Sequence, residues 1–352
     1  MRVDLFDYEL PTASIAQAAR PRGSSRLMVL DGVAGAPEHR RFSDLPSLLR
    51  PGDLLVRNDV GVRPARLYGK DGEDRLTEIF LVRREDATRW RCLAKPGRRA
   101  KPGRSLAFEE GVTATVETVH DDGSRTVRFD RALDDDLLAR IGRTPLPPYI
   151  RRDAGAPDSA EDRAAYQTVF ARENLAVAAP TAGLHFTPEI LSALANRGVE
   201  IADLTLEVGP GTFKPVTVED SDAHRMDAEE VALPRDTLDA IARAKREGRR
   251  VVAVGTTVTR SLEAYERLEE KPVGEPARFA TDLFITPGFD FRVVDVLLTN
   301  FHLPRSTLLM LVSAFAGRER LLEAYAQAVR SGYLFYSFGD AMLIGGDPTR
   351  QP

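Results

Sequence analysis

The sequence predicts an α/β protein in which a large domain of alternating strands and helices carries an inserted small all-β domain. Residues 62–127 are rich in β-branched side chains between Gly and Asp turns, and they show no helix pattern. From about residue 175 onward, short apolar strands alternate with helices, which is typical of a mostly parallel sheet covered by helices. We assign residues 1–61 and 151–352 to the large domain and residues 62–150 to the insertion.

The insertion is predicted to be a small barrel or sandwich. Its clearest strands are Leu76–Val82, Val112–Val119 and Arg125–Phe129, and the turn Asp121–Gly123 joins the last two. No helix is expected before Asp134. Several short strands without helices are typical of compact all-β domains.

In the large domain, helix boundaries follow from local capping signals. Thr187 is a suitable N-cap residue, Pro188 suits the first helical position, and Gly198 ends that helix. Ser306 and Asp236 are expected to cap later helices in the same way. The expected strands are 175–179, 199–208, 250–254, 283–286 and 293–298, and the expected helices are 187–198, 236–248, 256–268, 306–315 and 319–330.

Composition limits the class of protein. The chain has 352 residues, 43% of them hydrophobic, and its net charge of -4 argues against a non-specific polyanion binder but not against a local basic surface. Cys92 is the single cysteine, which excludes an intrachain disulfide and a multi-cysteine zinc site and favours a reducing compartment. No signal-peptide pattern is present, and the longest apolar run, Leu308–Ala316, is too short to span a bilayer. We therefore expect a cytoplasmic protein.

Polar residues follow several of the predicted strands. His185 lies in the loop between a buried strand and a helix start, where backbone N–H groups can hold a polar ligand group. Gly183 permits close backbone approach, and Thr181 adds a hydroxyl group. Imidazole is the commonest general acid or base, so His185 is a candidate catalytic residue. The alternative is a structural histidine beside a capping threonine.

A glycine-bearing loop follows the strand that ends near residue 208. Gly209 and Gly211 lie in it, Thr212 adds a hydroxyl group, and Phe213 is placed to stack on a base. The Gly-Lys-Ser/Thr ending of a Walker loop is missing. Glu207 precedes the loop. The alternative is a tight turn with Phe213 in the core.

Two further strand ends carry candidate site residues. Thr256 and Arg260 follow one strand, and the guanidinium fork of Arg260 can bind a carboxylate or phosphate. Asn300 and His302 follow another strand, and the alternative role for His302 is packing at the helix entry. The spacing shows no His-x-x-x-His pair, so we expect no metal site. His39 and His120 are interpreted as surface residues, and His224 is assigned to a surface loop. The alternative for His224 is an imidazole beside the carboxylates of residues 219–222, which would raise its pKa.

A basic segment stands out within the β-rich insertion, and Arg151 and Arg152 lie at its boundary. Such cations can follow phosphates and position an RNA without reading its sequence. The alternative is a solubilising loop. The candidate RNA-binding residues are Lys95, Arg98, Arg99, Lys101, Arg104, Arg151 and Arg152.

Short motifs along the whole chain resemble one enzyme family. They are Asp7–Pro11, Ser25–Asp31, Arg50–Asp59, Pro64–Leu67, Leu93–Gly97, Leu146–Ile150, Ala178–Thr187, Val208–Phe213, Val254–Thr257, Arg260–Glu263, Leu298–Pro304 and Ser337–Met342. In this order they are similar to the S-adenosylmethionine:tRNA ribosyltransferase-isomerase family of queuosine biosynthesis. Glu207 stands where that family frequently has a histidine.

The resemblance implies a monomer with a large barrel-like α/β domain and an inserted small β-barrel. It implies transfer and isomerisation of the ribosyl unit of S-adenosylmethionine onto the 7-aminomethyl-7-deazaguanine of tRNA, with release of adenine and methionine. S-adenosylmethionine is then a co-substrate, and no cofactor is required because the sulfonium supplies its own activation. The implied catalytic residues are His185, Glu207 and His302, and the implied substrate-binding residues are Asn58, Arg66, Thr181, Gly183, Phe186, Gly209, Gly211, Thr212, Phe213, Thr256, Arg260 and Asn300. The alternatives are a small-molecule nucleotide transferase and a non-catalytic RNA-binding protein.

Overall fold

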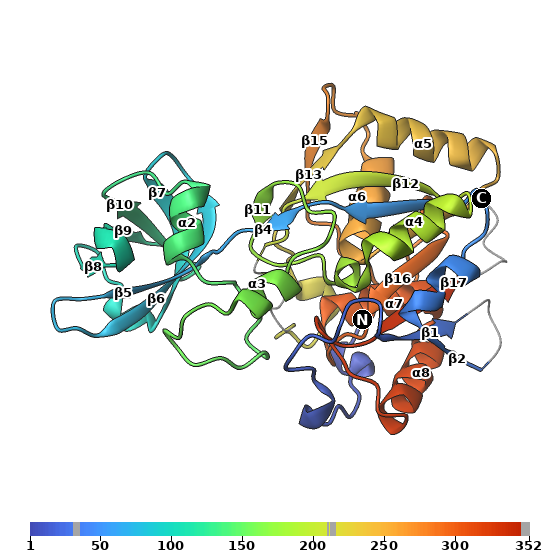
Figure 1. Ribbon diagram of the computed structural model, residues 1–352, viewed down its shortest axis with the longest axis horizontal. Coiled ribbons are helices and arrows are strands. Elements are labelled where there is room, and N and C mark those ends of the chain that lie inside the picture. The colour runs from blue at the N-terminus through green and yellow to red at the C-terminus, as the bar shows by residue number, and fades with distance from the viewer. Residues whose placement is uncertain (31–35, 210, 212–215, 346–352) are drawn as a thin grey trace. The chain divides into compact units, whose positions relative to one another are not determined.

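The computed structural model describes residues 1–30, 36–209, 211 and 216–345 and contains two compact units (Figure 1). The large unit comprises Met1–Val60, Gln167–Arg172 and Ala179–Pro352, and the small unit comprises Gly61–Tyr166 and Glu173–Ala178. Segments 151–166 and 173–178 therefore group with the small unit, whereas the sequence places the boundary at residue 150.

The large unit is built on a nine-stranded sheet in the order β15-β13-β12-β3-β14-β16-β17-β1-β2. The strands are β1 (Arg26–Leu30), β2 (Glu38–Arg41), β3 (Leu54–Asn58), β12 (Glu200–Leu206), β13 (Glu229–Leu233), β14 (Val251–Val254), β15 (Ala277–Thr281), β16 (Val296–Asn300) and β17 (Ala341–Gly345). The α/β class is confirmed, but the expectation of a mostly parallel sheet is wrong. Neighbouring strands are parallel in only four of the eight pairs, because β2, β13, β15 and β17 each run opposite to a neighbour. The strand expected at 283–286 is also wrong, since β15 lies earlier in the chain.

The register brings many strand ends to one edge of this sheet. β12, β3, β14 and β16 are mutually parallel neighbours, so their carboxyl ends lie together. Ala341 at the start of β17 is opposite Asn300, and it is also opposite Leu27 in β1. The starts of β1 and β17 therefore share this edge. Glu229 at the start of β13 lies here too, because β13 is antiparallel to β12. We call this edge the strand-end edge.

Helices of the large unit begin mostly where the capping signals predict. The helices are α1 (Leu45–Leu48), α4 (Pro188–Asn196), α5 (Arg235–Arg246), α6 (Thr256–Arg267), α7 (Thr307–Ala316) and α8 (Arg318–Arg330). The Thr187 hydroxyl accepts the N–H of Ile190 at 3.2 Å, and the Ser306 hydroxyl accepts that of Leu309 at 3.1 Å. Asp236 is not a cap, because α5 already begins at Arg235. The short α1 precedes residue 134, where no helix was expected.

The small unit confirms the inserted all-β barrel. Its closed barrel has the order β10-β7-β6-β5-β8-β9. The strands are β5 (Arg66–Lys70), β6 (Leu76–Arg84), β7 (Arg89–Lys95), β8 (Ser105–Ala107), β9 (Thr113–Val119) and β10 (Arg125–Phe129), with helices α2 (Asp135–Ile141) and α3 (Ala160–Ala165) beyond them. Closure pairs every strand and leaves no open sheet edge. Trp90, Cys92 and Phe129 are buried in the barrel core.

A separate two-stranded sheet also belongs to the small unit. Strand β4 (Gly61–Val62) pairs in parallel with β11 (Asn174–Ala176). The strand expected at 175–179 in the large sheet therefore lies in the small unit instead. No helix in the described parts of the chain is both long and apolar enough to cross a membrane.

A buried carboxylate on α6 fixes the chain that leads into β16. Glu263 is fully buried and accepts backbone N–H groups of Arg292, Val293 and Val294 at 3.0, 2.9 and 3.0 Å. Arg267 pairs with the same carboxylate at 2.7 Å. Three backbone donors that would otherwise be unsatisfied therefore depend on this one side chain.

Replacing Glu263 with Ala should lower the free energy of unfolding by about 3–5 kcal/mol, because it leaves buried donors without an acceptor. Glu263→Gln should cost less, since the amide keeps one acceptor oxygen. Urea unfolding measures both effects. Glu266→Ala on the exposed side of α6 is the matched control and should change stability by less than about 0.5 kcal/mol. An equal loss in the Glu263→Ala and Glu266→Ala variants would contradict the assignment.

Candidate active site

His185 lies at the strand-end edge, at the end of the 3-10 helix η6 (Thr181–His185). It is 4% exposed, and both ring nitrogens are bonded. Nδ1 is 3.0 Å from the Ser25 hydroxyl, and Nε2 is 3.1 Å from the Asn300 amide nitrogen. That amide nitrogen also donates to the Tyr336 carbonyl at 3.1 Å, which fixes the orientation of the amide. Nε2 must therefore be the acceptor, so the proton resides on Nδ1 and points to Ser25.

The protonation state of His185 follows from its burial. Desolvation lowers its pKa to about 4, and this outweighs the attraction of Asp340, which acts to raise it. The imidazole is therefore neutral at pH 7, in agreement with the acceptor role of Nε2. A neutral ring with a hydrogen bond at each nitrogen is well suited to orient its neighbours.

Three buried polar atoms beside His185 and on α6 have no hydrogen-bond partner among the described residues. They are the Asn300 side-chain oxygen, the Thr257 hydroxyl and one terminal nitrogen of Arg260. These residues are 2%, 7% and 4% exposed. Because an unpaired buried polar atom costs roughly 1–3 kcal/mol, such atoms at a sheet edge indicate a ligand that supplies the missing partner. The Asn300 oxygen is an acceptor, the Arg260 nitrogen is a positively charged donor, and the Thr257 hydroxyl can donate or accept.

A buried ion pair links Arg260 to the glycine loop. Arg260 pairs with Glu229 at 2.7 Å and donates to the Leu283 carbonyl at 3.0 Å. The other Glu229 oxygen accepts the N–H of Gly209 at 3.0 Å. Glu229 therefore aims the guanidinium and holds the start of the loop after β12. Gly211 lies close to Asp227, since a Cβ there would lie 2.4 Å from an oxygen of that side chain.

The remaining strand ends are in close contact. A Cβ built at Gly255, before α6, would lie 3.6 Å from Ala182 in η6 and 3.7 Å from the Thr257 hydroxyl. Gly255 has φ +92°, a conformation that favours glycine. A Cβ at Gly183 would meet Phe170 at 2.8 Å and Thr168 at 3.0 Å. The loops after β14 and β16, together with η6, therefore form one continuous surface.

Other predicted residues of the large unit have different positions. Thr181, in η6, and Thr256, at the start of α6, lie at the edge. Glu207 is half-buried directly after β12, and its backbone N–H donates to the backbone carbonyl of Glu230 at 3.0 Å. Phe186 is fully buried between Phe42 and Phe170 and acts as a core residue. Thr212 and Phe213 lie outside the described residues.

Asn58 and His302 have structural partners. The Asn58 amide donates to the Leu206 carbonyl at 3.1 Å, and its oxygen accepts the N–H groups of Val60 and Leu206, both at 3.1 Å. Asn58 thus ties β3 to β12. His302 is bonded to the Thr299 hydroxyl at 2.9 Å, and burial lowers its pKa to about 3. Its surroundings favour the packing alternative.

Arg66 and the basic segment belong to the small unit. Arg66 donates to the Leu146 carbonyl at 2.8 Å, and its Nε has no hydrogen-bond partner among the described residues but lies 3.5 Å from a Glu78 carboxylate oxygen. Arg99 is also held, since it donates to the Leu76 carbonyl at 2.8 Å, and Arg152 pairs with Asp162 at 2.7 Å. Arg151 is exposed. In contrast, the exposed cations of the basic segment (residues 95–104) that form no ion pair with a described residue are Lys95, Arg98, Lys101 and Arg104.

Sequence reasoning missed four residues of the site. Ser25 and Asp340 lie inside recognised motifs but were not singled out, and Glu229 lies in none. Asp59 follows β3 and accepts the Thr205 hydroxyl at 2.6 Å, and burial raises the pKa of its carboxyl group above the ordinary value. His39 is exposed, as its interpretation as a surface residue requires, and its ring is bonded to the Tyr333 hydroxyl at 2.8 Å.

We found no group of three or more His, Cys, Asp or Glu side chains arranged to hold a metal ion among the described residues.

Comparison with known proteins identifies the family. Residues 3–344 match the family model described as queuosine biosynthesis protein. An S-adenosylmethionine:tRNA ribosyltransferase-isomerase of Rhodospirillum rubrum is 53% identical over 351 residues, covering 98% of each chain. The enzyme of the same name from Thermotoga maritima is 48% identical over 98% of this chain and all of its own. A crystal structure of a Thermotoga maritima S-adenosylmethionine tRNA ribosyltransferase matches with a TM-score of 0.54 and 39% identity, covering 97% of this chain and 99% of the other. The polar strand ends that meet at one edge of the large sheet form the candidate active site. Because the matches span nearly the whole length of the chain, the chain belongs to the queuosine biosynthesis protein family.

Proposed function

We infer that the chain is an S-adenosylmethionine:tRNA ribosyltransferase-isomerase. It transfers and isomerises the ribosyl unit of S-adenosylmethionine onto the 7-aminomethyl-7-deazaguanine of tRNA, and epoxyqueuosine-tRNA, adenine and methionine are the products. The observation that carries this proposal is the set of unpaired buried polar atoms at the strand-end edge of a chain that matches such enzymes over its full length. No resident cofactor is needed, because the sulfonium of S-adenosylmethionine activates its own ribosyl unit.

Asn300, Thr257 and Arg260 are proposed to bind the reacting groups. The Asn300 oxygen accepts a hydrogen bond from substrate, and the Arg260 nitrogen donates to a group that carries negative charge. His185 is neutral and donates toward Ser25, so we assign it the positioning of the Asn300 amide. Such preorganised groups need no rearrangement during the reaction.

Glu207 is proposed as the proton acceptor. Glu229, the other carboxylate beside the glycine loop, is buried and locked in its ion pair with Arg260. Glu207 is half-buried directly after β12 and keeps contact with solvent. A general base must exist in both protonation states, which partial exposure permits.

The small unit is proposed to bind tRNA through its unpaired cations. Arg125 holds their loop by donating to the carbonyl of Gly97 at 3.1 Å and of Ala100 at 3.4 Å. A rigid loop carrying unpaired Arg98 and Lys101 can bind phosphates at little cost in ordering. We further propose that the enzyme is cytoplasmic, because its substrate is tRNA, and monomeric, as the resemblance to its family implies.

The activity is tested by incubation with S-adenosylmethionine and tRNA that carries the aminomethyl deazaguanine precursor. Mass spectrometry of the digested RNA should show the added cyclopentane unit, and chromatography should show equimolar adenine. Enzyme without S-adenosylmethionine is the control. Folded protein that gives neither product would exclude the proposed function.

Thr257→Val should reduce kcat/KM about 3- to 10-fold while leaving the melting temperature unchanged or raised. The hydroxyl has no hydrogen-bond partner among the residues that the structure describes, so we expect its loss to affect only bound substrate. Ser313→Ala is the matched control, because this buried hydroxyl on α7 also has no partner and lies away from the edge. A loss of melting temperature with unchanged kcat/KM in Thr257→Val would assign the hydroxyl a structural role.

Charge reversal of Arg98 and Lys101 together should raise the KM for tRNA about 10-fold or more and leave the KM for S-adenosylmethionine unchanged. Arg83→Glu is the control. Lys95 of the basic segment is opposite Glu78 in β6, and the exposed Arg83 lies near the other end of β6. Steady-state kinetics at two salt concentrations measures the effect. An unchanged KM for tRNA would favour a solubilising loop.

A further inference from the structure

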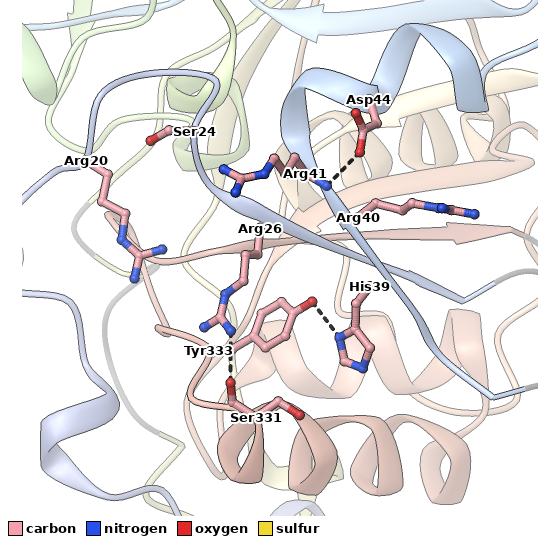
Figure 2. A pocket seen from close by; sticks show the side chains of 9 residues that line it. All are labelled: Arg20, Ser24, Arg26, His39, Arg40, Arg41, Asp44, Ser331 and Tyr333. Carbon is pink, nitrogen blue, oxygen red and sulfur yellow. Dashed lines mark hydrogen bonds between the residues drawn. The ribbon is translucent and has the colours of Figure 1, made fainter.

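The large unit also has an arginine-lined pocket beside β1 and β2 (Figure 2). Its volume is about 700 Å³, which is within the range of pockets that bind nucleotide-sized ligands. Four of its lining residues are Arg20, Arg26, Arg40 and Arg41. None of them has a role in the site described above, so the ligand of this pocket is a separate question.

The charges of the pocket do not cancel. Asp340 is buried beneath it and pairs with Arg20 at 2.9 Å and Arg26 at 3.3 Å, while Arg40 pairs with Glu38 at 2.7 Å. The one carboxylate in the lining, that of Asp44, accepts the backbone N–H of Arg41 at 3.0 Å. Four guanidinium groups thus face three carboxylates, which leaves a net charge of +1. The guanidinium of Arg41 forms no ion pair with a described residue.

The floor of the pocket is rigid. The Arg26 guanidinium lies 3.9 Å from the centre of the Tyr333 ring, and Asp340 also accepts the Arg26 backbone N–H at 2.8 Å. The Tyr333 hydroxyl is bonded to His39 at 2.8 Å, as Figure 2 shows. Arginine side chains held in this way lose little freedom when an anion binds, and their planar donor groups match phosphate geometry.

The pocket adjoins the candidate active site through one stretch of chain. Ser24 lines the pocket, and the next residue, Ser25, bonds His185 at 3.0 Å. The N–H of Gly23 donates to the His185 carbonyl at 2.9 Å. A polymer whose reacting unit lies at the strand-end edge therefore has its neighbouring unit within reach of the pocket.

We propose that this pocket binds a backbone phosphate of the substrate RNA next to the reacting nucleotide, with Arg41 as the principal contact. The proposal rests on the proposed function. The carboxylate of S-adenosylmethionine is the other anion in the reaction. Arg20, Arg40 and Arg41 are all exposed, however, whereas sites for small ligands enclose most of the ligand surface. An exposed arginine row is typical of contacts to a nucleic-acid backbone.

The test compares Arg41→Glu with Arg50→Glu. Arg50 is an equally exposed arginine that precedes β3 and so lies at the opposite edge of the sheet. Fluorescence anisotropy with labelled tRNA, without S-adenosylmethionine, should give a dissociation constant about 5- to 10-fold higher for Arg41→Glu and unchanged for Arg50→Glu. Arg41→Ala should make the slope of log Kd against log salt shallower by about one. The KM for S-adenosylmethionine should not change.

Two results would overturn the proposal. One is a raised KM for S-adenosylmethionine with unchanged tRNA affinity, which would assign the pocket to the amino-acid carboxylate. The other is equal behaviour of the Arg41→Glu and Arg50→Glu variants, which would leave Arg41 as an ordinary surface residue. Both results are distinct from failure of the proposed function, which would appear as absence of product with wild-type protein, because tRNA affinity is measured without turnover and a KM can be measured only when product forms.

Discussion

The parallel alignment of β12, β3, β14 and β16 is the constraint on which the site depends. Parallel neighbours must end at the same edge, and each ends in buried backbone whose polar groups need partners. Side chains just beyond the strands supply those partners: Asn58 satisfies groups of β12, and Asn300 binds the Tyr336 carbonyl. The same requirement that completes the sheet therefore gathers amides, hydroxyls and imidazoles in one place.

Not every polar group at this edge is used in that way, and the difference separates structure from chemistry. Asn58 has both its amide nitrogen and its oxygen bonded within the protein, whereas Asn300 leaves its oxygen without a partner among the described residues. His302 follows β16 of the large sheet, whereas His185 lies at the end of η6 and is bonded to the last residue of β16, and both histidines remain neutral. The His185 ring is bonded to Asn300, whereas the His302 ring is bonded to its near neighbour Thr299 and packs in the core. The two asparagines are the same residue type at strand ends, and the two histidines are both buried and neutral. Only their hydrogen-bond partners distinguish a structural role from a role in the site.

The fold was predictable from sequence where its causes are local. Thr187 and Ser306 cap their helices because a cap depends on residues three positions away. The barrel was predictable from its β-branched strands, but strand direction in the large sheet was not. β17 comes from the end of the chain and pairs with both β16 and β1, which depends on contacts that are distant in sequence. The positions of Thr181, Glu207, Arg260 and Asn300 at one edge followed from strand ends. Ser25, Glu229 and Asp340 were missed because they act through partners more than 25 residues away.

The closed barrel encloses a single thiol, which can be used to detect opening of this unit. Cys92 is the single cysteine of the chain and is fully buried in the barrel core, where desolvation raises the pKa of the thiol. A thiol reagent can reach it only when the barrel opens. The rate of alkylation therefore reports opening of this unit alone and is blind to fluctuations of the nine-stranded sheet, so the chain carries a natural label for following one of its two cores.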